Sequence, residues 1–188
     1  MVEIIPYQTS WPAEFRQIAL VLRRGLGDLA VRIDHIGSTS VPGLAAKDVI
    51  DVQITVAALD QPLLAAMSAL GYTRPEGTWR DHPPAGLDPA ASQWEKWFFR
   101  VPPGQRPTHT HIRIMGRANQ RYPLLFRDYL RTHPATADSY AELKRRLAAN
   151  LADPQTYPEV KDPAVDLIYW AAEEWATATH WQPGPSDA

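Results

Sequence analysis

Apolar residues near the start of the chain recur at the spacing of an α-helix. They fall on one face, and the pattern ends at Gly27. The residues concerned are Phe15, Ile18, Ala19, Leu22 and Leu26. Ser10 is placed to cap this helix, with Pro12 in its first turn. A second helix is predicted between Asp60 and Gly71, where apolar residues again lie three and four positions apart.

Strand-like alternation separates these two helices. Residues 31–34 alternate apolar with charged side chains, and this strand runs into residues 35–43, which are rich in turn formers. Residues 49–56 alternate again, with isoleucine and valine on one face and Asp51 and Gln53 on the other. The two strands are therefore joined by a Gly/Ser loop.

The second half of the chain predicts a hairpin followed by helices. Residues 96–101 and 109–115 have strand character and are joined by a Pro-Pro-Gly segment. The predicted helices cover residues 120–132, 134–151 and 163–180, with breaks at Asp153-Pro154 and Asp162-Pro163. Residues 73–93 show little periodicity and predict a long loop or a ragged hairpin.

This order of elements predicts an α+β (α/β) fold, in which a small mixed sheet is flanked by helices. We expect a single domain over residues 1–181, helical from about residue 118, and a disordered tail over residues 182–188.

Composition narrows the classes of protein. The 188 residues are 45% hydrophobic and 21% charged, which suits one globular domain. The absence of cysteine excludes thiol catalysis, cysteine-bound zinc and iron–sulfur clusters. The start of the chain lacks the pattern of a signal peptide, and no window approaches the roughly 20 apolar residues that span a bilayer. A cytoplasmic location without membrane contact is expected, and the oligomeric state is left open.

Charge is distributed unevenly along the chain. Between Lys96 and Arg131 there are eight basic residues and one acid, so this segment carries +7 and the remainder −9 of the net charge of −2. This pattern favours a local anion site over a globally basic nucleic-acid binder. The aromatic run at 97–99 is better explained by burial than by base stacking, so no nucleic-acid partner is expected.

The Gly/Ser loop is the first candidate site. Gly37 lets a ligand approach the backbone closely, and the hydroxyls of Ser38, Thr39 and Ser40 can join backbone N–H groups in holding phosphate oxygens. The loop lacks the lysine and spacing of a P-loop and the pattern of a dinucleotide-binding fingerprint. A plain turn is the alternative.

One face of the strand at 109–115 is the second candidate. His109, His111 and Arg113 project from this face, and the Arg113 fork suits a phosphate or carboxylate group. Two histidines at this spacing suit zinc, but a third ligand is not evident locally. The run matches only part of the patterns of histidine-triad hydrolases and of paired His-x-Thr phosphoesterases. An exposed sheet face without a ligand stays open as an alternative.

Several segments together resemble the GrpB family, also known as UPF0157. They are Val2 to Tyr7, Trp11-Pro12, Asp34 to Leu44, Ala46-Lys47, Ile50-Asp51, His109 to Ile112 and Phe126 to Leu130. Related domains occur fused behind dephospho-CoA kinase, and the family is grouped with the nucleotidyltransferase fold of DNA polymerase beta. The resemblance therefore implies a nucleotidyltransferase-like fold, and the family's biochemical activity is not established.

The resemblance also implies roles for individual residues. Gly37 and Ser38 match the Gly-Ser pair that contacts a triphosphate, and Asp51 matches the first metal-binding carboxylate. Gln53 stands in place of the second carboxylate, and His109 or His111 in place of the third. These departures put metal-dependent nucleotidyl transfer in question.

The leading hypothesis is a protein that binds a nucleotide or another phosphorylated small molecule, including a CoA-related one. If it is an enzyme, Asp51 is expected to hold Mg²⁺, while charge on the transferred group is neutralised by Lys47, Arg100 and Arg113. His35 or His111 is then the expected general base. The alternatives are a catalytically inactive ligand-binding or partner-docking module and a histidine-ligated metal hydrolase.

Overall fold

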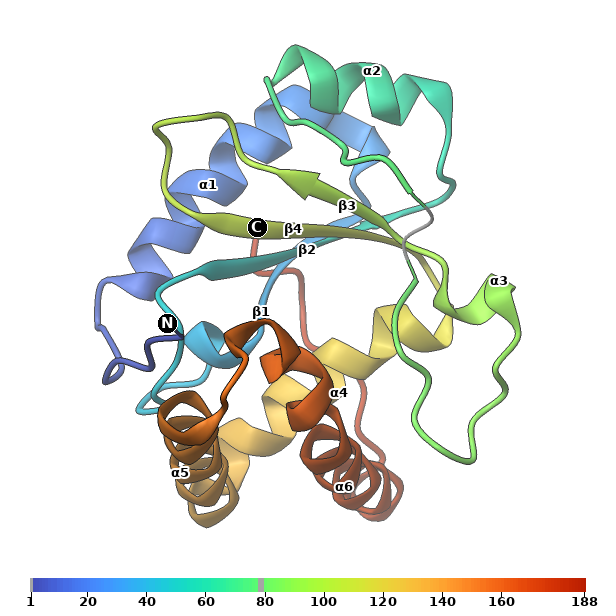
Figure 1. Cartoon of the computed structure of the whole chain (residues 1–188). Helices are drawn as coiled ribbons and strands as arrows, with labels where there is room; N and C mark the ends of the chain where they lie inside the picture. Colours follow the sequence, from blue (N-terminus) through green and yellow to red (C-terminus); the bar gives the residue numbers. More distant parts are fainter. Residues whose placement is uncertain (1, 78–79) are drawn as a thin grey trace.

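A four-stranded mixed sheet lies at the centre of the chain, with helices on both sides (Figure 1). The structure is a computed structural model and describes residues 2–77 and 80–188. The strands are β1 (Arg32–Ile36), β2 (Ile50–Val56), β3 (Trp97–Arg100) and β4 (Thr108–Ile114), in the spatial order β1-β2-β4-β3. The central pair, β2 and β4, is parallel, and both outer pairs are antiparallel. The mixed α+β fold predicted from the sequence is confirmed.

One face of the sheet is apolar and is covered by α1 (Trp11–Leu26) and α2 (Gln61–Ala69). The alternate residues Ile50, Val52 and Ile54 of β2 are fully buried in this layer. Complete burial of such a side chain stabilises the fold by about 1.5–3 kcal/mol. The alternation over residues 49–56 therefore fixes which face of β2 packs and leaves Asp51 and Gln53 on the other face.

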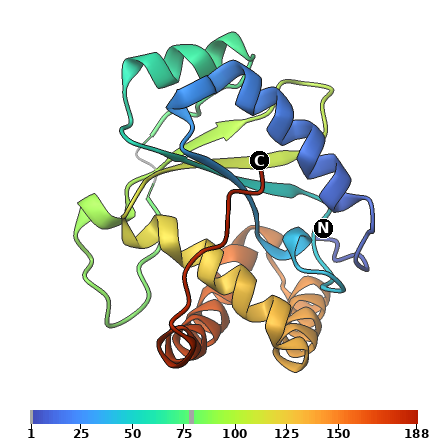
Figure 2. The ribbon, with the colours of Figure 1, turned by 180° about the vertical axis from the view of Figure 1, so that it is seen from behind.

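Three long helices pack together on the opposite side of the sheet (Figure 2). They are α4 (Ala118–Thr132), α5 (Pro134–Asn150) and α6 (Tyr157–Thr179), and they enclose a second apolar core. Short elements complete the chain: η1 (Gly27–Leu29), η2 (Ser38–Ser40), η3 (Pro154–Thr156) and α3 (Ala91–Trp94). No helix within the described residues is long and apolar enough to cross a membrane.

Two helix ends differ from the sequence prediction. Helix α6 begins at Tyr157 and continues through Pro163, where a break was expected. Packing of α6 against α4 and α5 outweighs the one backbone hydrogen bond that an internal proline removes. At the start of α1, Ser10 takes the N-cap position, but its side chain makes no capping hydrogen bond.

Residues 182–188 were expected to be a disordered tail, but the segment runs from α6 to the sheet, and residues 185–188 contact the open edge of β1 (Figure 2). The Ser186 hydroxyl oxygen accepts a hydrogen bond from the Ile33 N–H at 2.9 Å, and Asp187 accepts one from the His35 N–H at 2.9 Å. Asp187 also pairs with Arg127 at 2.8 Å. An edge strand has unpaired backbone groups, and these polar residues form hydrogen bonds with them. The sequence analysis did not predict this contact because it relied on the spacing of apolar residues, which this segment lacks.

Candidate functional site

The turn after β1 brings Gly37 against the carboxylate of Asp51. Gly37 has φ +69°, and a Cβ at this position would lie 2.2 Å from Asp51 Oδ2. Both the backbone conformation and the close approach require glycine. The Gly37 turn and Asp51, distant in sequence, therefore form one structural unit.

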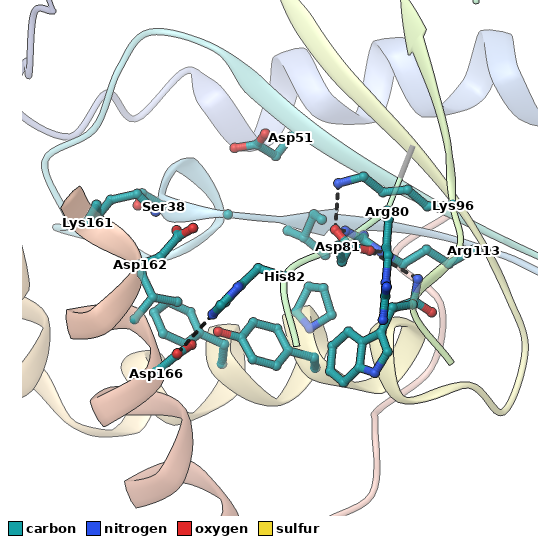
Figure 3. A pocket seen from close by; sticks show the side chains of 18 of the residues that line it. Ser38, Asp51, Arg80, Asp81, His82, Lys96, Arg113, Lys161, Asp162 and Asp166 are labelled. Atoms are coloured by element: carbon teal, nitrogen blue, oxygen red, sulfur yellow. Dashed lines mark hydrogen bonds and ion pairs between the residues drawn. The ribbon is translucent and has the colours of Figure 1, made fainter. Parts of the chain in front are cut away.

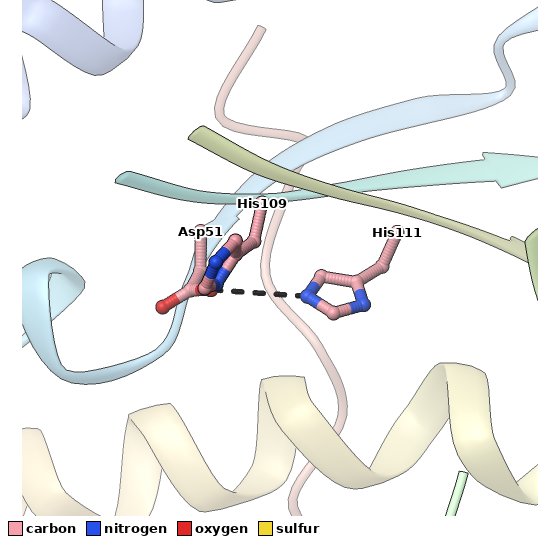
Figure 4. A group of neighbouring side chains, drawn as sticks. All are labelled: Asp51, His109 and His111. Atoms are coloured by element: carbon pink, nitrogen blue, oxygen red, sulfur yellow. Dashed lines mark hydrogen bonds and ion pairs between the residues drawn. The ribbon is translucent and has the colours of Figure 1, made fainter. Parts of the chain in front are cut away.

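Asp51 meets His109 and His111 on the sheet face that points toward α4 (Figure 4). Because β2 and β4 pair in parallel, Asp51 lies beside His109 and Gln53 beside His111. Asp51 Oδ1 is 3.2 Å from His109 Nδ1 and 3.8 Å from His111 Nε2. One donor atom from each residue lies within 4.8 Å of the other two. A third group of the metal-ligand type, which the local sequence did not reveal, thus lies on the neighbouring strand.

The environment sets the protonation of this cluster. Burial would raise the pKa of Asp51, but hydrogen bonds and positive charge from His109 and His111 hold it well below its ordinary value. Burial lowers the pKa of His111 to about 4, against the opposing hydrogen bond to Asp51. At neutral pH the cluster therefore presents a carboxylate and, at His111, a neutral imidazole with a free lone pair.

Two adjoining cavities open beside this cluster. The first, about 410 Å³ and named here the lysine cavity, is lined by Ser38, Asp51, His109, His111 and four lysines. These lysines are Lys47, Lys96, Lys144 and Lys161, which are all the lysines of the chain. Among the described residues that line the lysine cavity, Asp51 is the one acid.

The second cavity, about 470 Å³, is named here the aromatic cavity (Figure 3). It shares five lining residues with the lysine cavity: Ser38, Asp51, Lys96, Tyr140 and Lys161. Its own lining combines aromatic rings with acids: Trp94, Tyr122, Phe126, Asp81, Asp162 and Asp166. Both volumes lie in the range of small-molecule sites.

Lys144 of α5 links the helical layer to the Gly37 turn. Its ammonium donates hydrogen bonds to Ser38 Oγ at 2.8 Å and to the Ala45 carbonyl at 2.5 Å. Burial, together with the smaller effect of the nearby Lys161 and Arg145 charges, lowers the pKa of Lys144 to about 7. Burial likewise lowers the pKa of Lys161, although Asp162 and Asp51 oppose this shift.

Asp81 anchors the long loop of residues 80–90 to the sheet (Figure 3). Its carboxylate accepts hydrogen bonds from Arg113 at 2.8 and 2.9 Å, from Lys96 at 2.5 Å and from Asn119 at 3.1 Å. Burial would raise the pKa of Asp81, but Arg113 and Lys96 hold it well below the usual range. In the same loop, His82 faces Asp166 of α6 at 3.2 Å.

Several predicted site residues in and after the Gly37 turn are already engaged within the fold, and of these Thr39 and Lys47 line the lysine cavity. The Thr39 hydroxyl bonds His35 Nε2 at 3.0 Å, and the Ser40 hydroxyl donates to the Gly37 carbonyl at 2.6 Å. Lys47 lines the lysine cavity, with its ammonium 4.1 Å from the centre of the Tyr157 ring. Of the three hydroxyls expected to hold phosphate, the one that lines both cavities is that of Ser38.

Three other predicted residues lie elsewhere. His35 is buried on the α1 side of the sheet, where its ring stacks on that of Phe15 with 4.6 Å between the ring centroids. Burial lowers the pKa of His35 to about 4. Arg100 faces His109 across the hairpin but lines neither the lysine nor the aromatic cavity. The guanidinium of Arg113 is 4% exposed and is bound by Asp81 and Gln53, so its fork is not free for a ligand.

Gln53, which stands in place of a second carboxylate, is a structural residue here. Its carbonyl oxygen accepts a hydrogen bond from Arg113 at 2.8 Å, and its amide donates to the Gln120 carbonyl at 2.9 Å. Both ends of the fully buried side chain are therefore occupied within the fold.

The sequence analysis missed Lys144, Lys161 and Asp81. Lys144 is four residues after Tyr140 and lies on the buried face of α5, so a lysine at an apolar position of a helix was an available signal. Lys161 lies in a segment that was not predicted to be helical. Asp81 lies in a loop without periodicity, so no pattern marked it.

A mixed sheet, a glycine turn packed on a strand carboxylate and a lysine-lined cleft define the class of fold and site. The chain belongs to the GrpB family: the family model described as GrpB protein matches residues 1–170. Among solved structures, the crystal structure of conserved protein GrpB from Enterococcus faecalis is similar, with a TM-score of 0.71 and 30% identity. That similarity covers 92% of this chain and 99% of the other.

Two relatives at similar identity are both longer than this chain. The chain is 37% identical over 203 residues to a dephospho-CoA kinase of Mycobacterium tuberculosis, covering 96% of this chain and 48% of the kinase. It is 36% identical to UPF0157 protein PA4798 of Pseudomonas aeruginosa, covering 89% of this chain and 66% of that protein. The chain spans about half the length of the dephospho-CoA kinases that it matches.

Proposed function

We propose that the chain binds a phosphorylated small molecule, a nucleotide or a CoA-related compound, across the two cavities. The observation that carries the proposal is the convergence of all four lysines on one cavity beside Ser38. Among the described residues, Lys47, Lys144 and Lys161 form no ion pair with a carboxylate. Uncompensated ammonium groups in a partly dry cavity favour an anion with several oxygens.

The aromatic cavity suits the remainder of such a ligand. Tyr122 and Phe126 offer rings for stacking, and Asp162 and Asp166 offer acceptors for hydroxyl or amino groups. A phosphate among the lysines would place an attached sugar and base next to Ser38 and Lys161, which line both cavities. The relationship to proteins named dephospho-CoA kinase supports a nucleotide or CoA-related ligand.

The proposal stops at binding and does not include nucleotidyl transfer. Gln53 is bonded at both ends within the fold, so it does not supply the second metal-binding group that the nucleotidyltransferase pattern requires. A binding role needs the lysine cavity alone.

Isothermal titration calorimetry of the full chain tests the proposal. ADP, CoA and dephospho-CoA are titrated in buffer with EDTA, and adenosine serves as the ligand without phosphate. We expect at least one phosphorylated ligand to bind about tenfold or more tighter than adenosine. Equal binding of adenosine, or no heat with any of the phosphorylated ligands, would refute the proposal.

Matched variants locate the site. Lys161→Met and Lys144→Met should each weaken binding by about tenfold or more, since each removes one charge from the cavity. Arg145→Met removes a charge from the neighbouring position of α5, where the side chain is half exposed, and should leave affinity within about twofold. Loss of binding in Arg145→Met to the same degree would point to general electrostatics instead of this cavity.

A further inference from the structure

Asp51, His109 and His111 supply three metal-ligand groups of two chemical kinds. Each residue offers one donor atom, and the three atoms lie within 4.8 Å of one another. Two imidazoles and one carboxylate on one face are a set that binds first-row transition metals and leaves coordination positions open. We propose that these three residues form a binding site for a transition-metal ion of the Zn²⁺, Mn²⁺ or Co²⁺ type.

The backbone brings the three residues together without a loop. Asp51 and His109 lie at paired positions of β2 and β4, and His111 lies two residues further along the same face of β4. Sites built on strands hold their ligands more rigidly than sites on loops. The metal site is thus a property of the parallel strand pair at the centre of the sheet.

The orientation of the rings also suits a shared ion. Phe98 of β3 packs against both imidazoles, with ring centroids 5.7 Å from His109 and 5.4 Å from His111. Figure 4 shows both rings turned toward the Asp51 carboxylate. Metal bonds of about 2.0–2.2 Å place tetrahedral ligand atoms roughly 3.5 Å apart. Asp51 Oδ1 is 3.2 Å from His109 Nδ1 and 3.8 Å from His111 Nε2.

The same donors suit Mg²⁺ poorly. Mg²⁺ takes oxygen ligands, usually carboxylates and substrate phosphates, in octahedral geometry. Here Asp51 is the one carboxylate of the cluster, and Gln53 is occupied by Arg113 and the Gln120 carbonyl. The Mg²⁺ expected from the superfamily pattern is therefore replaced in this proposal by a metal that accepts nitrogen.

The open positions of the ion would face the lysine cavity, which Asp51, His109 and His111 all line. The site itself does not depend on the proposed phosphorylated ligand. Failure of phosphate-ligand binding in EDTA would remove the proposed function and leave this inference standing.

Metal titration of the full chain, purified without a histidine tag and stripped with chelator, tests the site. We expect one equivalent of Zn²⁺ to bind in calorimetry and Co²⁺ to give visible absorption bands of a nitrogen- and oxygen-ligated ion. Mg²⁺ should bind at least about 100-fold more weakly than Zn²⁺. No stoichiometric Zn²⁺ binding would overturn the inference.

Substitutions assign the ligands. His109→Gln, His111→Gln and Asp51→Asn should each weaken Zn²⁺ binding by about 100-fold and change the Co²⁺ spectrum. The His109 side chain is 50% exposed, so His109→Gln is the variant expected to fold normally, which circular dichroism checks. His180→Gln, at the exposed end of α6, serves as the control and should bind Zn²⁺ like the original chain. Unchanged affinity in both His109→Gln and His111→Gln would refute the assignment.

Discussion

At the scale of single residues, position 37 requires glycine partly because of its contact with Asp51. A Cβ at Gly37 would meet Asp51 Oδ2 at 2.2 Å, in addition to the strain of its positive φ. Gly43 has φ +81° but open space around the Cβ position. A comparison of substitutions at Gly37 and Gly43 therefore separates the effect of steric contact from that of backbone strain.

We expect Gly37→Ala to lower the free energy of unfolding by about 3 kcal/mol and Gly43→Ala by about 1 kcal/mol. Chemical denaturation measures both. Gly37→Ala should also displace Asp51 and so weaken Zn²⁺ binding. Equal losses of stability in the two variants would show that contact with Asp51 contributes nothing.

Lys144 gives the stability of the fold a pH dependence. In the folded chain its pKa is lowered from 10.5 to about 7, mainly by burial. Between pH 7 and 10 the unfolded chain therefore binds more protons at this lysine than the folded chain, and stability rises with pH. The free energy of unfolding should increase from pH 7 to pH 9 more in the original chain than in Lys144→Met. Identical pH dependence in the two proteins would contradict the lowered pKa.

Residue patterns explain why part of the site was predictable. Gly37 and Ser38 follow a predicted strand, and Asp51 lies within a strand of strict alternation, so the face of Asp51 could be assigned from the sequence. The histidines of β4 were assigned to one face for the same reason. Alternation does not say which strands are neighbours, so the meeting of Asp51 with His109 and His111 required the β2–β4 pairing.

At the scale of elements, the loop of residues 80–90 is held to the sheet through Asp81, which forms ion pairs with Arg113 and Lys96. Arg113 is 4% exposed, and Asp81 supplies its counter-charge at 2.8 Å. Removal of one partner from a buried pair leaves an uncompensated charge. This loop therefore stabilises the sheet as well as lining the aromatic cavity.

Asp81→Asn should lower the free energy of unfolding by about 3 kcal/mol. Glu142→Gln, which breaks an exposed pair with Arg146 on α5, should leave the free energy of unfolding almost unchanged, because solvent screens an exposed pair. Thermal or urea denaturation of the two variants gives the comparison. A similarly small change in the free energy of unfolding in both variants would show that water can replace the Asp81 carboxylate as the partner of Arg113.

The charge pattern along the sequence predicted an anion site between Lys96 and Arg131, whereas the site proposed here also draws on lysines outside that segment. The segment from Lys96 to Arg131 carries +7, but most of its cations pair with acids from other elements: Arg106 with Glu14, Arg113 with Asp81 and Arg121 with Glu173. The free ammonium groups belong to Lys47, Lys144 and Lys161, which lie outside that segment. The order of charges along the chain does not show which charged side chains form ion pairs between different helices and strands. The lysine cavity therefore could not be predicted from the sequence.

At the scale of the whole molecule, the two proposals meet in one cavity. The positive charges of the lysines repel a metal ion bound beside Asp51. An anionic ligand offsets these charges and can also occupy open coordination positions of the metal ion. Metal and ligand should therefore bind cooperatively, with a coupling of roughly 1–3 kcal/mol, equivalent to a factor of about 5–150.

The coupling is measured by titrating ADP with and without saturating Mn²⁺, and Mn²⁺ with and without ADP. The two factors should agree, since coupling of binding is reciprocal. His109→Gln should lose the coupling and keep its affinity for ADP in EDTA. Any coupling that remains in this variant measures the contribution of metal–ADP complexes formed in solution. Independent binding in the original chain would contradict a shared cavity.

The gathering of every lysine in one cavity has a chemical consequence beyond binding. Fifteen arginines supply the other basic side chains, and guanidinium groups resist the acylation and imine formation that neutral amines undergo. Side-chain amine chemistry is thus confined to the cleft between the sheet and the helices α5 and α6. With its pKa near 7, Lys144 is the amine with a large neutral fraction at physiological pH. An aldehyde that carries a phosphate would therefore mark lysine side chains in this cleft and no lysine elsewhere on the protein.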